Sequence, residues 1–278
     1  MVIRVHSGGG KGAPSLFAGP ALVFRNVWEH STLTRHMVKK DIKLAYHGTF
    51  LGYLWTLLEP LLMTIILYAL FIILRGSSDE YLPLKVILGI LFYSCFSKTM
   101  AMSTNALIHN TSLINQVYFP REIFHVNIAG YQLYRLVMSL LIIVPMMIWY
   151  QISPTIHLLL LIPAILGISM LGIGFGMIAS IIQVRIRDVS QLVNVLLRAG
   201  FFISGVFYGA EHVPVKWLHF HLLNPVAVYI EVSRSAVLGN MGVIGIEHIL
   251  YALGLSLLFM LFGMGIFKRF ESRMVKYL

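Results

Sequence analysis

LAYHGTFLGYLWTLLEPLLM, residues 44–63, opens beside a cluster of lysines and runs into an apolar stretch that carries Glu59-Pro60 at its middle. From Tyr53 this stretch extends to about residue 74, enough for a helix to cross the roughly 30 Å of hydrocarbon in a bilayer. An ionisable group inside such a helix is costly unless it faces protein, water or a charged partner. Pro60 lacks the N–H that would bond to the carbonyl of Thr56, so that carbonyl can accept from water or another side chain. The stretch therefore predicts a kinked spanning helix with one face turned away from lipid.

The rest of the chain has the same character. Of 278 residues, 58% are hydrophobic and only 12% are charged, which excludes an ordinary soluble domain. The apolar runs are continuous rather than alternating, so they indicate helices and not barrel strands. We expect an all-α integral membrane fold with six transmembrane helices, at about 53–74, 82–104, 127–150, 156–182, 189–208 and 246–267.

The net charge of +10 orients the chain rather than suggesting a nucleic-acid partner. Lysine and arginine gather before the first span, between the fourth and fifth spans, and after the last. With an even number of spans these segments lie on one side, which the positive-inside rule makes the cytoplasm. We expect a multi-pass protein of the cytoplasmic (inner) membrane with both termini cytoplasmic. Residues 1–24 are expected to form a flexible tail, residues 25–52 a cytoplasmic interfacial region, and residues 53–278 the transmembrane domain.

Residues 33–46 predict a basic amphipathic helix on the cytoplasmic membrane surface. One face is apolar and the other carries Arg35, Lys39, Lys40 and Lys43. Such a cluster suits an anionic headgroup, although a simple topology signal explains each cation individually.

Two segments between the spans are too apolar to be plain linkers. Residues 104–126 predict a short helix with an apolar side, which is typical of a docking element for another protein, and a plain connector is equally compatible with the spacing. Residues 208–240 are broken by Pro214 and Pro225 and predict two short helices dipping into the outer leaflet. Three histidines in this second segment come with no carboxylate at a metal-ligand spacing, so we expect no metal site.

Four segments carry a family resemblance. They are VKKDIKLAYHGTFLGYLWTLLEPLLM at 38–63, FPREIF at 119–124, IRDVSQLVNVLLRAGFFISGVFY at 186–208 and LLNPVAVYIEVSRSAVLG at 222–239. In this order they resemble the membrane subunits of type-2 ABC exporters, and within them the polysaccharide exporters for O-antigen, capsule and teichoic acid. The family commonly has Asn-Pro where this chain has Glu59-Pro60, so the carboxylate is unusual.

The resemblance implies a homodimer bound to two copies of a separate ABC ATPase subunit. ATP and Mg would be bound by that partner, with no cofactor in this chain, which would be a transport subunit and not an enzyme. The cargo would be a polyprenyl-diphosphate-linked glycan, with O-antigen ahead of teichoic acid or capsule. Residues 104–126 resemble the family's coupling helix and 211–236 its paired re-entrant gate helices. The expected ATPase-coupling residues are Leu113, Ile114, Val117, Tyr118, Arg121 and Glu122.

A glycan also needs a pathway whose walls tolerate sugar, and aromatic faces can stack on pyranose rings. The candidates for lining such a channel are Tyr53, Trp55, Tyr68, Phe92, Tyr93, Tyr131, Tyr134, Phe201, Phe202, Phe207 and Tyr208. Glu59 is expected to pair with Arg135 or Arg198 inside the membrane, and a structural role for that pair is preferred over substrate contact. Alternatives are an ABC-2 exporter of a drug or small lipid, an ion-coupled transporter, and an intramembrane glycan-processing enzyme.

Overall fold

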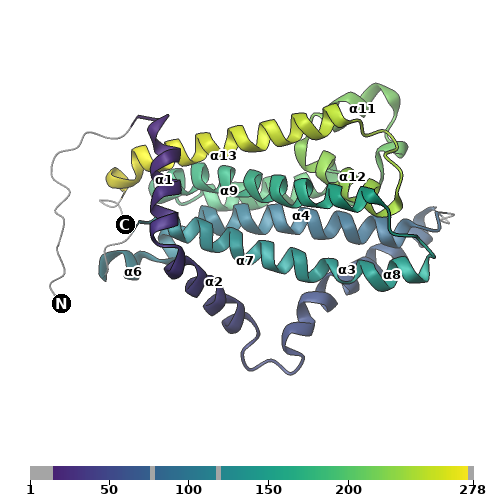
Figure 1. Ribbon diagram of the computed structural model, residues 1–278, viewed down its shortest axis with the longest axis horizontal. Helices are drawn as coiled ribbons and strands as arrows, with labels where there is room; N and C mark the ends of the chain where they lie inside the picture. The colour runs from purple at the N-terminus through teal and green to yellow at the C-terminus, as the bar shows by residue number, and fades with distance from the viewer. Residues whose placement is uncertain (1–14, 76–78, 117–119, 275–278) are drawn as a thin grey trace.

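The computed structural model describes residues 15–75, 79–116 and 120–274, and within these ranges every regular element is a helix. The elements are α1 Ala18–Glu29, α2 Ser31–Tyr46, η1 Gly52–Leu54, α3 Trp55–Arg75, α4 Leu82–Thr104, α5 Ala106–His109, α6 Thr111–Gln116, α7 Glu122–Leu140, α8 Ile143–Trp149, η2 Ile156–Leu160, α9 Leu161–Arg185, α10 Val189–Ile203, η3 Ala210–His212, α11 Val215–Leu222, α12 Pro225–Leu238 and α13 Ile246–Met274. Helices α4, α7, α9 and α13 run side by side along the long axis (Figure 1).

Five helical segments of the described chain are long and apolar enough to cross a membrane. They are Gly52–Ile73, Leu82–Thr104, Glu122–Trp149, Ile156–Arg185 and Ile246–Glu271. The all-helical membrane fold expected from the sequence is therefore confirmed. The third span begins at Glu122 rather than at 127, because its polar first turns are buried against other helices instead of lying in a loop.

The predicted span at 189–208 is shorter than expected. Its helix, α10, has 15 residues and so measures about 22 Å, less than the hydrocarbon thickness. The helix stops before Gly205, which has a φ of +69° that a side chain would disfavour. Six full-length spans are thus not present in the described residues, where α10 is a shorter apolar helix beside five long ones.

Glycines bring helices α9 and α13 into backbone contact. A Cβ added to Gly263 would lie 2.4 Å from the carbonyl oxygen of Gly174, and one added to Gly174 would lie 2.6 Å from that of Phe259. Small residues at a helix interface allow this close approach in membranes. Helix α4 packs against α9 and α7 and is mostly buried, whereas α3 lies at the edge with much of its surface exposed.

The N-terminal helices cross one end of this bundle. Helix α1 packs against α13, and the α5–α6 segment and the end of α13 lie at the same end, whereas α8 and α11 lie at the other (Figure 1). The expected interfacial helix is helical over Ser31–Tyr46, has no buried residue, and joins α3 through a loop so that α2 and α3 form an open V. Its Asp41 accepts a 2.6 Å hydrogen bond from Asn127 of α7.

Within the predicted coupling segment 104–126, the described residues include the two short helices α5 and α6 and the start of α7. Leu113 and Ile114 lie on α6, whereas Val117 and Tyr118 lie outside the described residues. The predicted pair of helices at 211–236 is also present, as α11 and α12.

Candidate functional site

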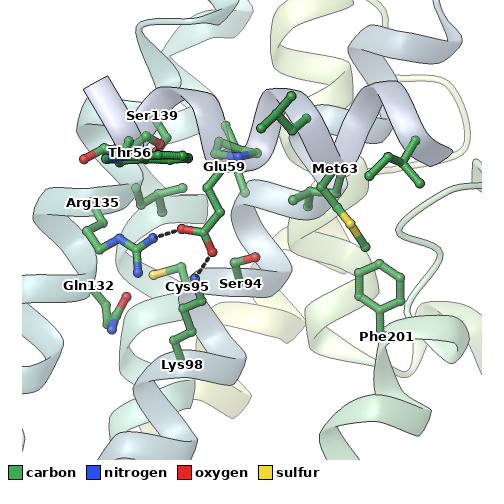
Figure 2. Close-up of a pocket in the computed structure, with 17 residues that line it drawn as sticks. Thr56, Glu59, Met63, Ser94, Cys95, Lys98, Gln132, Arg135, Ser139 and Phe201 are labelled. Atoms are coloured by element: carbon green, nitrogen blue, oxygen red, sulfur yellow. Dashed lines mark hydrogen bonds and ion pairs between the residues drawn. The ribbon is translucent and has the colours of Figure 1, made fainter. Parts of the chain in front are cut away.

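A cleft of about 560 Å³ lies between α3, α4 and α7. Each helix lines it with residues at the i, i+3, i+4, i+7 spacing that places them on one face. These are Thr56, Glu59, Pro60 and Met63 on α3, Leu91, Ser94, Cys95 and Lys98 on α4, and Gln132, Arg135, Leu136 and Ser139 on α7. The cleft therefore mixes charged, hydroxyl and apolar groups inside the spanning helices, as Figure 2 shows.

Three charged side chains meet in this cleft, and we call them the intramembrane cluster: Glu59, Lys98 and Arg135. Lys98 Nζ lies 2.7 Å from Glu59 Oε1, and an Arg135 terminal nitrogen lies 2.5 Å from Glu59 Oε2 (Figure 2). The side chains of Glu59, Lys98 and Arg135 are 55%, 36% and 20% exposed, so the cluster faces the open cleft. One carboxylate thus holds two cations, which leaves a net charge of +1 in the intramembrane cluster.

The expected pairing of Glu59 with Arg135 is confirmed, whereas Arg198 does not join it. Lys98 was missed because it is six residues from the end of its span, where a lysine is easily assigned to the interface. The signal was its place in the same helical stripe as Ser94 and Cys95.

Pro60 has the effect expected from its missing N–H. The hydroxyl of Ser139 on α7 donates to the carbonyl of Thr56 at 3.0 Å, and both residues are buried. The carbonyl freed by the proline therefore fastens α3 to α7 beside the intramembrane cluster.

A second hollow of about 580 Å³ continues the cleft toward α10. It shares Lys98 and Phe201 with the first and adds Arg198 and Phe202. Arg198 is exposed and has no carboxylate partner among the residues that the structure describes. The two hollows together therefore hold three cations and one carboxylate.

The predicted channel aromatics separate into several groups. Trp55 lines the cleft, Phe201 lines both hollows, and Phe202 lines the second. Phe207 and Tyr208 line a hollow of about 370 Å³ beside η3, and Tyr53 and Tyr134 line one of about 490 Å³ below the α2–α3 loop. Tyr68 packs partly buried against the core, and Tyr131 is also partly buried.

Two of these aromatics are largely enclosed by the protein. Phe92 is completely buried in the helix core, so its expected role as a channel wall is wrong: its ring has no exposed surface for a sugar. Tyr93 is only 4% exposed but lines the second hollow, and its hydroxyl donates to the carbonyl of Leu197, which joins α4 to α10.

A second charged group, the Lys268 cluster, joins α1, α7 and α13. Lys268 Nζ lies 3.0 Å from Glu122 Oε1 and 2.8 Å from Glu271 Oε2, while Arg121 lies 3.2 Å from Glu271. Asn26 of α1 donates to Glu122 at 2.6 Å. Glu122 is 0% exposed, which corrects the expectation that it contacts an ATPase directly. The first turn of α7, next to the α5–α6 segment, is instead fastened to the two terminal helices.

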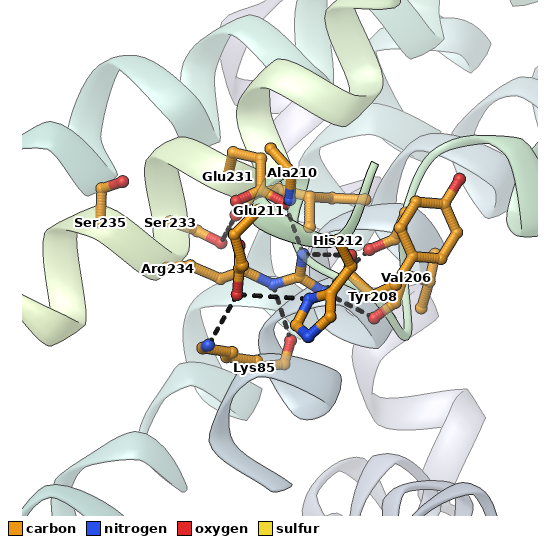
Figure 3. A network of polar contacts seen from close by, with 12 residues as sticks. Lys85, Val206, Tyr208, Ala210, Glu211, His212, Glu231, Ser233, Arg234 and Ser235 are labelled. Atoms are coloured by element: carbon orange, nitrogen blue, oxygen red, sulfur yellow. Dashed lines mark hydrogen bonds and ion pairs between the residues drawn. The ribbon is translucent and has the colours of Figure 1, made fainter. Parts of the chain in front are cut away.

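A third group, the Arg234 cluster, is centred on Arg234, which is 3% exposed (Figure 3). Its guanidinium makes five hydrogen bonds, to the carbonyls of Lys85, Gly205, Val206 and Tyr208 at 2.8–3.0 Å and to Glu231 at 2.6 Å. These contacts fasten the loop after α10 to α4 and α12.

Lys85 also pairs with Glu211 at 2.8 Å and with Asp79 at 3.0 Å. Burial alone would raise the pKa of Glu211, but the hydrogen bond and positive charge of Lys85 outweigh it and hold that pKa below 4.5. The loop before α4 and the loop after α10 are therefore held together by charge.

The cations of α2 lie apart from the cleft. Arg35, Lys39, Lys40 and Lys43 line neither hollow, and Lys40 has Asp41 at 3.3 Å. Their expected contact with a substrate headgroup stays a prediction.

Comparisons with known proteins find relatives among polysaccharide export proteins. The O-antigen export system permease protein RfbA of Klebsiella pneumoniae is 26% identical to this chain over 246 residues. The match covers 87% of this chain and 93% of the relative. The polysialic acid transport protein KpsM of Escherichia coli is 26% identical over 204 residues, 72% of this chain and 78% of the relative. The capsule polysaccharide export inner-membrane protein CtrC of Neisseria meningitidis serogroup B is 24% identical over 268 residues, which cover 91% of this chain and 97% of the relative. The family described as ABC-2 type transporter matches residues 32–238, and the chain belongs to that family.

Proposed function

We propose that this chain is the membrane subunit of an ATP-driven exporter that moves a lipid-linked cell-surface polysaccharide, with O-antigen as the first candidate, out across the cytoplasmic membrane. The observation that carries the proposal is a polar, charged cleft within the spanning helices of a chain whose near full length matches polysaccharide export permeases. A hydrated polymer needs a polar lining to cross the hydrocarbon layer. Polar groups at this depth are tolerated only where they line a cavity or are buried in protein, so the cleft is a place where such a lining can exist.

The pathway forms between two copies of the chain. Helices α3 and α10 border the two hollows and present apolar side chains outward, among them Ile65 and Ile73 on α3 and Leu192 and Leu196 on α10. A second copy covering these faces would place two clefts opposite each other. Trp55, Phe201 and Phe202 then supply aromatic faces for sugar rings.

The α5–α6 segment meets the ATPase, which binds ATP and Mg and drives the movement. Leu113 is the apolar contact on α6, and the exposed residues of this segment flank it. Because the Lys268 cluster fastens the first turn of α7 to α1 and α13, a push on the α5–α6 segment moves three helices together. Glu122 acts inside this linkage and not at the ATPase surface.

The chain crosses the membrane six times, with α10 completing the fifth crossing through the loop that Arg234 holds. Both termini lie in the cytoplasm, which agrees with α1 and the end of α13 lying at one end of the bundle. Helices α11 and α12 form the outer gate. The cations of α2 gather anionic lipid headgroups at the inner surface.

One observation favours a second candidate, export of a drug or small lipid. The cleft of about 560 Å³ lies within the size range of small-molecule sites and has an apolar side formed by Leu62, Met63 and Ile66.

Co-purification tests the proposal. The chain is expressed with the candidate ATPase, isolated through a tag on the chain, and assayed for ATP hydrolysis. We expect a stable 2:2 complex that is lost in Leu113→Glu, with the exposed Val215→Glu on α11 at the opposite end as the matched control. A chain that never retains an ATPase would contradict the proposal.

A further inference from the structure

We propose that the intramembrane cluster is a binding site for a lipid-attached phosphate, which Glu59 occupies as an internal counterion until the phosphate displaces it. The inference deepens the proposed export function and rests on it for the route of the ligand. The phosphate belongs either to a polyprenyl carrier or to a bilayer phospholipid, and the experiment below separates these sources.

The geometry of the cluster is that of an occupied anion site. The two oxygens of the Glu59 carboxylate each take one cation, at 2.7 Å from Lys98 and 2.5 Å from Arg135. The two cations are thereby held in place for any group that offers two oxygens, and a phosphate offers them with the fork geometry that arginine prefers. One terminal nitrogen of Arg135 donates to Glu59, and its other N–H groups have no hydrogen-bond partner within the part of the chain that the structure describes, so they remain available to a larger anion.

The charge of the site is unbalanced. The cluster has two cations for one carboxylate, and Arg198 in the adjoining hollow adds another cation without a carboxylate partner among the described residues. Excess positive charge inside a spanning region is costly unless an anion accompanies it. A ligand phosphate relieves this imbalance, whereas a purely structural ion pair has no need for the second and third cations.

The position and exposure of the cluster also suit a mobile ligand. Glu59 is seven residues from Gly52 and Lys98 is six from Thr104, so both lie about 10 Å from the same end of their spans. Glu59 is the most exposed member at 55%, and its side chain reaches into the cleft from α3, the helix least covered by others (Figure 2). The carboxylate can therefore turn away without uncovering a packed core.

Equilibrium binding of a radiolabelled polyprenyl monophosphate to the purified full chain tests the site, with uncharged polyprenol as the parallel ligand. Glu59→Gln removes the competing carboxylate and is expected to tighten phosphate binding about tenfold, while Lys98→Gln and Arg135→Gln weaken it about tenfold. Lys216→Gln, an exposed cation on α11, is the matched control and leaves binding unchanged.

The sign of the Glu59→Gln effect decides the inference. A structural ion pair predicts equal or weaker binding in this variant, and that result overturns the proposal, as does equal binding of polyprenol and its phosphate. Should either cation variant fail to fold, Glu59→Gln alone still gives the answer. Competition by phosphatidylglycerol at matched concentration assigns the phosphate to bilayer lipid, and its absence assigns it to the carrier. Because no ATPase is present, failure here leaves the export proposal standing, and failure of ATPase capture leaves this result standing.

Discussion

Replacing Arg234 by lysine tests how the α11 end of the bundle is held together. The arginine makes five hydrogen bonds, four of them to backbone carbonyls, and is 3% exposed. Lysine keeps the charge, but its three N–H donors all lie on one nitrogen, so at least two of the five acceptors lose their hydrogen-bond donor. Each buried unsatisfied group costs about 1–3 kcal/mol, which gives a loss of about 2–6 kcal/mol for Arg234→Lys.

The assay is thermal unfolding of the purified chain followed by tryptophan fluorescence. At about 2 °C per kcal/mol for a chain of this size, the midpoint should fall by roughly 4–12 °C. Lys216→Met removes an exposed cation on neighbouring α11 and should shift the midpoint by about 1 °C or less. A midpoint for Arg234→Lys within about 1 °C of wild type would refute the reasoning, because it would mean that the charge alone and not the fork holds the loop after α10.

Three further outcomes follow from individual contacts, each read from the same unfolding assay. Gly263→Ala places a Cβ 2.4 Å from the Gly174 carbonyl oxygen and should lower the midpoint by several degrees, whereas Gly254→Ala, in open space on the same helix, should not. Ser139→Ala removes the donor to the Thr56 carbonyl and should cost about 1–3 kcal/mol; an unchanged midpoint would contradict that contact. Folding lowers the pKa of Glu211 from its ordinary value of 4.5, so its contribution to stability is complete above about pH 4.5 and is lost as the pH falls through the folded pKa. Glu211→Gln should remove this acid-dependent loss of stability. A variant whose unfolding midpoint varies with pH as in the wild type would count against the ion pair.

Local rules explain what could be predicted from the sequence. The loss of one backbone hydrogen bond at Pro60 follows from covalent structure, and only the donor, Ser139, needed the fold. Charged residues are so rare within the apolar runs that only a few could pair with Glu59. Arg135 was one of them, so the ion pair could be predicted. Spans of about 20 apolar residues follow from composition, because no other element can hide its backbone in lipid.

The missed features all depend on long-range packing. The start of the third span looked like a loop because Glu122 is charged, yet Lys268 and Asn26 pair with it inside the protein. A hydropathy scale treats every residue of a span as if it faced lipid, so it cannot take account of such partners. The early end of α10 depends on Arg234, about 30 residues further along the chain.

The same limit applies to the candidate site. An aromatic side chain in a spanning helix has no direction until its neighbours are known, so Phe92 and Phe201 looked alike although one is enclosed and the other lines both hollows. Lys98 could be found only by asking which α4 residues share a face.

The measurement that tests the central claim most directly is transport in proteoliposomes that contain the chain and its ATPase, with a lipid-linked glycan on the ATPase side. The account predicts that glycan becomes accessible to a membrane-impermeant lectin on the far side only when ATP and Mg are supplied. Transport driven by an ion gradient without ATP, or chemical conversion of the glycan by the chain alone, would contradict it.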